Sequence, residues 1–89
     1  MHLSSNFEIV DVAGEYIAVP VGEAVMTFHG VVALTDATAF ILRKMTEPKS
    51  TSELVGLLTA EYDVEAINAE QDINQIIPKL LEIGIIEEE

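Results

Sequence analysis

Few residues in this sequence have the type and spacing that catalysis or metal binding requires. The two histidines, His2 and His29, have neither a second histidine one helical turn away nor a nearby carboxylate pair. The acidic residues between positions 63 and 72 lack the alternating ligands and central glycine of a calcium loop. No nucleophile elbow or phosphate-binding glycine loop occurs. The sequence therefore predicts no enzyme activity, no metal site and no cofactor.

The length and composition predict one small domain spanning residues 1–89. Hydrophobic residues make up 49% of the chain, which is enough for one core. The chain has no cysteine, which excludes disulfides and fits a reducing compartment. No apolar run approaches the roughly 20 residues of a membrane span, and no signal segment opens the chain. We expect a soluble, cytoplasmic protein.

The acidic charge narrows the choice of partner. The chain has 16 acidic and 4 basic residues, a net charge of -12. Nucleic-acid binding needs cations that neutralise phosphates, and an acidic surface is repelled by them and by anionic membranes. We therefore expect no nucleic-acid and no membrane partner, but one that is neutral, basic or mainly apolar.

The first third of the chain predicts a small antiparallel sheet. Residues 7–12 alternate as a half-buried strand does, and Ala13-Gly14-Glu15 follows as a turn. Residues 16–21 form the second strand of a hairpin, which Pro20 ends or places at an edge. Residues 24–28 are read as a further short strand or irregular chain. The apolar run 31–34 is the last strand and stops at Thr35, a helix-capping residue type.

Three helices are predicted after this strand. The first covers residues 36–45, and a Ser-x-x-Glu capping box beginning at Ser50 opens the second. Asn68 is read as the cap of a third helix over residues 69–83. Pro78 is expected to kink it, and Gly84 to end it before Ile85 and Ile86 fold back onto the core.

Two features suggest a binding groove. The third helix has an apolar face wider than a small core needs, comprising Ile73, Ile76, Ile77, Leu80 and Ile83. The strand 31–34 is a candidate sheet edge whose free amides and carbonyls could pair with an extended peptide. The alternative interpretation is that the sheet and the other helices cover this face completely.

These residues lie in an order that resembles the PqqD-like family, the recognition elements for precursors of ribosomally made, modified peptides. The resemblance covers roughly residues 7–86. It rests on five segments, which are Val32-Ala33-Leu34, the junction from Leu34 to Phe40, Thr51-Ser52-Glu53-Leu54, Glu61-Tyr62-Asp63-Val64, and Asp72-Ile73 leading to residues 80–86. Two positions differ from the family pattern, because Thr35 replaces the usual asparagine and Pro78 lies in the third helix.

The resemblance implies an α+β fold of the winged helix-turn-helix type, with a three-stranded antiparallel sheet followed by three helices. It also implies a non-catalytic protein that binds the leader segment of a precursor peptide by strand addition. Such a protein presents the leader to a modifying enzyme, often a radical SAM enzyme. The pathway would be pyrroloquinoline quinone synthesis or another peptide pathway. Carried over to this chain, the peptide-binding residues would be Val31, Val32, Ala33 and Leu34 on the strand and Asp72, Ile73, Ile76, Ile77 and Leu80 on the helix.

Two other functions share parts of this prediction. A winged-helix transcription regulator would have the same fold, but its recognition helix should be basic, and the third helix here has Lys79 alone against three acids. A homodimer could form if the free strand paired with its own copy.

Overall fold

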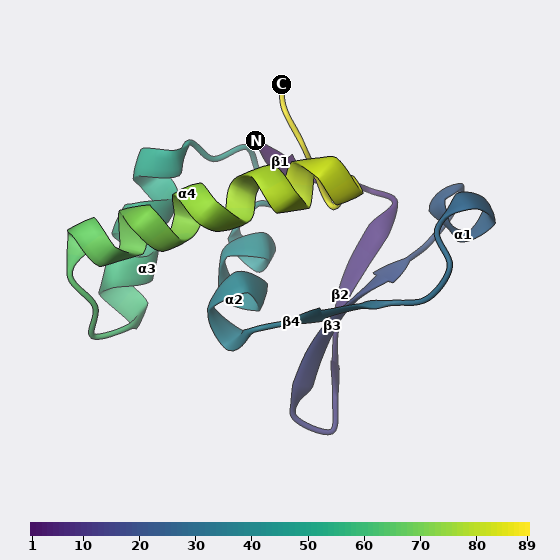
Figure 1. Cartoon of the computed structure of the whole chain (residues 1–89), viewed down its shortest axis with the longest axis horizontal. Helices are drawn as coiled ribbons and strands as arrows, with labels where there is room; N and C mark the ends of the chain where they lie inside the picture. The colour runs from purple at the N-terminus through teal and green to yellow at the C-terminus, as the bar shows by residue number, and fades with distance from the viewer.

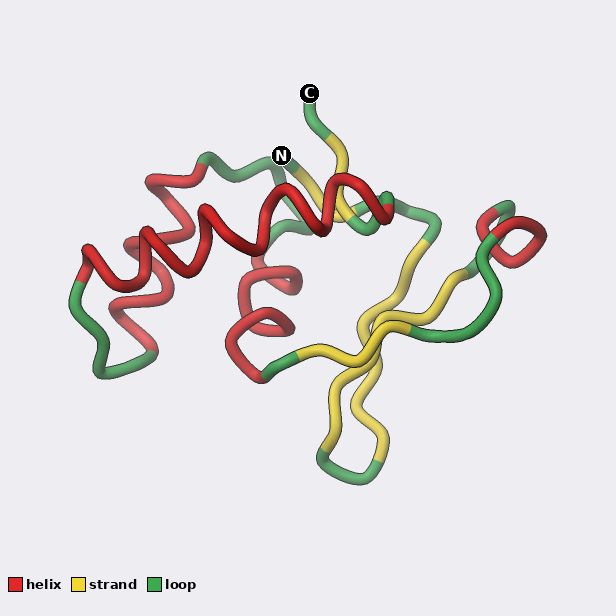
Figure 2. Tube along the Cα trace, in the orientation of Figure 1, coloured by secondary structure: helices red, strands yellow, loops and turns green.

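The computed structural model describes all residues 1–89 and shows an α+β fold (Figure 1, Figure 2). The elements in chain order are β1 (His2–Leu3), β2 (Phe7–Val12), β3 (Glu15–Pro20), α1 (Ala24–Thr27), β4 (Val32–Leu34), α2 (Asp36–Lys44), α3 (Thr51–Glu61), α4 (Ala66–Ile83) and β5 (Ile86–Glu87).

Strands β2, β3 and β4 form the predicted three-stranded antiparallel sheet, in that order. Ala13 and Gly14 connect β2 to β3 with φ values of 53° and 85°. Positive φ at both loop residues is the geometry that follows the right-handed twist of a two-residue hairpin. The amide of Gly14 also donates to the Asp11 carboxylate at 3.0 Å. The hairpin was therefore predictable from local turn chemistry.

Two helix starts agree with the sequence prediction. The Thr35 hydroxyl accepts a hydrogen bond from the amide of Thr38 at 3.1 Å and caps α2. At α3, the Ser50 hydroxyl accepts from the Glu53 amide at 3.2 Å, while the Glu53 carboxylate accepts from the Ser50 amide at 3.1 Å. These reciprocal bonds are the predicted capping box.

Helix α4 differs from its prediction at the start. It begins at Ala66 rather than Ala69, its N-cap is Glu65, and no side chain caps it, so the Asn68 cap was wrong. The residues by which the helix is longer than predicted include Ala66 and Ile67, which are both compatible with a helix. A backbone hydrogen bond from the Ala69 amide to the Glu65 carbonyl, at 3.0 Å, closes the first turn.

The end of α4 is as predicted. The helix continues as one element through Pro78, whose ring lies on the exposed face. Gly84 ends it in the left-handed conformation, with φ of 93°. Ile85 and Ile86 then turn inward and are 0% and 1% exposed.

Two elements were not predicted correctly. Residues 24–27 form the short helix α1, neither a strand nor irregular chain. The left-handed Gly22 (φ 59°) reverses the chain, and the carbonyls of residues 21–23 then accept hydrogen bonds from the amides three residues later. The ends of the chain also pair with each other, Leu3 opposite Ile86 in the β1–β5 ribbon. The terminal ammonium lies 2.7 Å from the Glu89 carboxylate.

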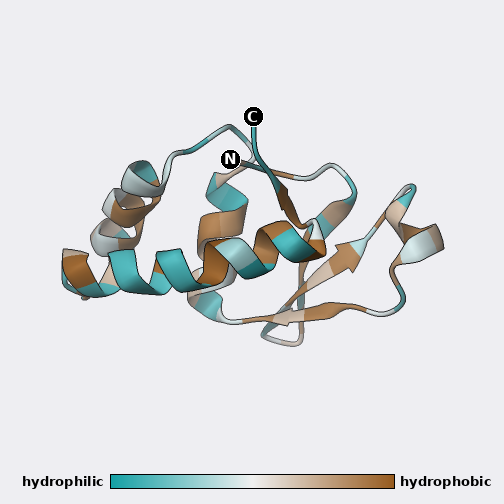
Figure 3. Cartoon of the chain, turned by 45° about the horizontal axis from the view of Figure 1, so that its top comes forward, coloured by the Kyte–Doolittle hydropathy of each residue, from teal (hydrophilic) through white to brown (hydrophobic).

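The core lies between the sheet and the helices. Helix α4 crosses α2 and packs on α3 (Figure 1). The fully buried large side chains come mostly from α2 and its C-cap, α3, α4 and the chain that follows α4, and they include Ile41, Leu42, Met45, Leu54, Ile73, Ile85 and Ile86. Hydrophobic and hydrophilic positions alternate along α4 in Figure 3, as expected of a helix with one face in the core.

Candidate functional site

Strand β4 is an edge of the sheet, as the sequence predicted. It pairs with β3 alone, with Leu34 opposite Tyr16, Ala33 opposite Ile17 and Val32 opposite Ala18. No strand pairs with its other side, so the outward backbone amides and carbonyls are available to an added strand.

The side chains of this edge alternate between two environments. Val32 and Leu34 are half-buried and pack against the core, whereas Ala33 and Val31 are exposed, Val31 to 54%. An alternating strand keeps its register because a shift by one residue would move Val32 and Leu34 out of the core. The edge therefore presents its backbone in a fixed position.

A hollow of about 310 Å³ lies where β4 enters α2. One wall comes from the beginning of α2 and the other from α4. The lining residues are Thr35, Ala37, Thr38, Asp72, Gln75, Ile76 and Lys79. The Thr35–Thr38 capping interaction forms part of this wall, and a second bond at 2.9 Å joins the two hydroxyls. The cap thus fixes the strand end and one side of the hollow together.

The structure divides the predicted helix wall into two groups. Asp72 and Ile76 line the hollow. Ile73, Ile77 and Leu80 lie in the core, at 0%, 9% and 4% exposed, and do not face it. In this structure the three side chains form part of the core, and their part in peptide binding stays a prediction. The helical period separates the two groups, because residues 69, 73, 77 and 80 share one stripe and residues 72, 76 and 79 share the next.

Five residues that line the hollow are not among the predicted peptide-binding residues, namely Thr35, Ala37, Thr38, Gln75 and Lys79. The helix residues carried over from the family resemblance did not include Gln75 and Lys79, although Gln75 lies one turn from Asp72 and Lys79 lies one turn from Ile76. Ala37 and Thr38 belong to α2, in which no site residue was predicted. Their position directly after the strand that ends at Leu34 was the signal that could have found them.

Two carboxyls that lie outside the hollow, those of Glu53 and Glu89, have a lowered pKa. Hydrogen bonds from the Ser50 amide and hydroxyl lower the pKa of Glu53, and the terminal ammonium and His2 lower that of Glu89. No three potential ligand side chains gather as a metal site, and no helix is long and apolar enough to span a membrane.

Two solved structures, each described as a complex with a leader peptide, have the same fold as this chain. A structure described as TbiB1 in complex with the TbiA(beta) leader peptide superposes with a TM-score of 0.78 at 19% identity, covering 100% of this chain and 98% of that one. A lasso peptide synthetase B1 complexed with the leader peptide gives a TM-score of 0.71 at 24% identity, covering 94% and 93% of the two chains.

The sequence itself identifies the family. The family described as coenzyme PQQ synthesis protein D (PqqD) matches residues 9–86, so the chain belongs to the PqqD family. No protein with a curated description matches it in sequence. The predicted family and the predicted α+β architecture are both confirmed.

Proposed function

We propose that this protein binds the leader segment of a ribosomally made precursor peptide as an added strand on β4. The observation that carries the proposal is the free edge of β4 beside the hollow lined by Ile76. Main-chain hydrogen bonds to an edge strand supply affinity, and an adjacent pocket supplies side-chain specificity. Membership of the PqqD family and the two leader-bound structures of the same fold support this function.

The peptide-binding residues in this proposal are Val31, Val32, Ala33 and Leu34 of the edge and Asp72 and Ile76 of α4, with Gln75 and Lys79 added. An antiparallel strand would continue the order of the sheet. Residues Ile73, Ile77 and Leu80 support the helix wall from within the core. A partner that is neutral or basic suits a chain with net charge -12.

The proposal includes a non-catalytic role in the cytoplasm, where precursors are synthesised. The protein would present the bound leader to a modifying enzyme, a radical SAM enzyme in the form we favour, in pyrroloquinoline quinone synthesis or another peptide pathway. Presentation requires no catalytic group in the protein itself.

The test is titration of the leader peptide encoded beside the gene, followed by backbone NMR. We expect the amide signals of residues 31–34 to shift most. Ile76→Asp should weaken binding at least tenfold, because it puts a charge into an apolar contact. Ile67→Asp is the matched control, since Ile67 lies on the same helix, is 62% exposed and does not line the hollow.

Three outcomes would contradict the proposal. The first is the absence of shifts with every neighbouring precursor, and the second is equal weakening by the two substitutions. The third is a homodimer that pairs through β4, because it would occupy the edge. A solution mass measurement with and without peptide distinguishes this last outcome.

A further inference from the structure

We infer that a second cavity, at the far end of β4 from the Ile76 hollow, binds a lysine or arginine side chain of the captured peptide. The inference rests on the proposed function and adds a sequence preference to it. The cavity has a volume of about 820 Å³ and lies between α1, the beginning of β2 and the end of α4. The residues that matter to the argument are Phe7, Phe28, Ile83, Glu23, Glu87 and Glu88.

The apolar surface of the cavity is built from aromatic and aliphatic side chains. The rings of Phe7 and Phe28 meet edge to face, with centroids 5.5 Å apart and planes at 79°. Ile83 lies in the last turn of α4 and is 37% exposed. Such a surface suits a long aliphatic chain, which gains by leaving water.

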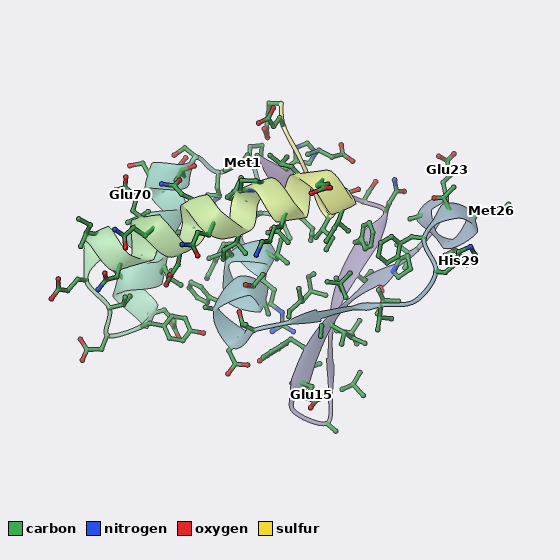
Figure 4. The ribbon with its side chains drawn as sticks, in the orientation of Figure 1. Met1, Glu15, Glu23, Met26, His29 and Glu70 are labelled. Carbon is green, nitrogen blue, oxygen red and sulfur yellow. The ribbon has the colours of Figure 1, made fainter.

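The polar lining of the cavity includes three carboxylates and no cation. Glu23 precedes α1, at the outer end of the molecule in Figure 4, whereas Glu87 and Glu88 follow α4. Glu23 and Glu88 take part in none of the ion pairs of the molecule. Glu87 has a contact of 3.5 Å with His2 Nε2. Lysine and arginine combine an aliphatic stem with a cationic head, and they are the side chains that match both surfaces.

The cavity also lies along the path of the added strand. Phe28 is followed by His29, Gly30 and Val31, which lead directly into β4. Four extended residues span about 13 Å, so a strand paired with Val32 reaches Phe28 within about four residues. An antiparallel strand runs toward the beginning of β4, which places the basic side chain in the C-terminal part of the bound segment.

The experiment is selection of random displayed peptides on the full-length protein. We expect enrichment of lysine or arginine about four residues after the β4-paired stretch. The double variant Glu23→Gln/Glu88→Gln should still select peptides but lose this preference. The control is Glu15→Gln/Glu65→Gln, which changes the net charge equally at exposed sites outside the cavity; Glu15 lies at the hairpin tip (Figure 4).

A selected peptide then gives a quantitative measurement. Replacing its basic residue by glutamine should weaken binding to the wild type about three- to tenfold at low salt, with a smaller loss at high salt. The same replacement should have little effect on binding to Glu23→Gln/Glu88→Gln.

Selected peptides that shift residues 31–34 without a basic preference, or with a preference retained in Glu23→Gln/Glu88→Gln, would overturn this inference alone. Failure to select any peptide that shifts those residues would overturn the proposed function as well.

Discussion

The division of α4 into a core stripe and a groove stripe can be tested with one pair of substitutions. Ile73→Ala removes a side chain that is 0% exposed, whereas Ile76→Ala truncates a half-buried side chain at the hollow. We expect the first to reduce stability with little direct effect on the groove. The second should reduce peptide affinity with little effect on stability.

The structure sets the size of both effects. An isoleucine-to-alanine change in a packed core costs about 2–5 kcal/mol, and about 3 kcal/mol lowers Tm by roughly 12–24 °C in a domain of this size. The whole domain is expected to be stable by about 4–13 kcal/mol. Ile76→Ala should cost less than about 1 kcal/mol of stability, because the removed atoms already border open space. Its loss in peptide affinity should approach tenfold.

Urea unfolding followed by far-ultraviolet circular dichroism measures the stability, since the chain has no tryptophan to report on unfolding. Affinity is measured on each folded variant with the leader peptide. Equal losses of stability in the two variants would refute the assignment of two stripes. So would a loss of affinity in folded Ile73→Ala that exceeds the loss in Ile76→Ala.

Two further predictions concern local structure. Hydrogen bonds from Ser50 lower the pKa of Glu53 from 4.5. The stability that the Glu53 carboxylate contributes is therefore complete above pH 4.5 and disappears as the pH falls through the lowered pKa. Glu53→Gln should consequently reduce the dependence of the urea-unfolding midpoint on pH in the acid range. Gly84→Ala should destabilise the protein by about 1 kcal/mol, because φ of 93° is strained for alanine. Gly56→Ala inside α3 should instead stabilise it by about 0.5–1 kcal/mol, because alanine restricts the unfolded chain. Both sites have open space for a methyl group, so the thermal midpoints of the two variants report backbone conformation alone.

Features set by neighbouring residues were predictable from the sequence. The caps at Thr35 and Ser50 and the helix end at Gly84 each depend on residues within one turn, so their chemistry is visible in the chain. Helix α4 has no side-chain cap, and the prediction that Asn68 caps it was wrong because Asn68 lies inside its first turn. The pairing of Leu3 with Ile86 joins the two ends of the chain and has no local signal.

The groove was predictable in outline and not in detail. Periodicity identifies which residues of a helix share a stripe, but two adjacent stripes of α4 both contain isoleucine. The choice between them depends on how the helix is rotated against α3 and the sheet, which only packing determines. Ile73 consequently belongs to the core and Ile76 to the hollow, although they differ by only three positions.

A free strand edge usually invites pairing with a second copy, and this chain has two features that oppose it. Strand β4 is only three residues long, and the net charge of -12 repels an identical molecule. A basic leader would be attracted by the same charge. Added salt should therefore weaken capture of a basic peptide, while any self-association through β4 should increase as the repulsion is screened. Sedimentation equilibrium and peptide titration over one salt series would measure both trends, and capture that strengthens with salt would contradict this role of the charge.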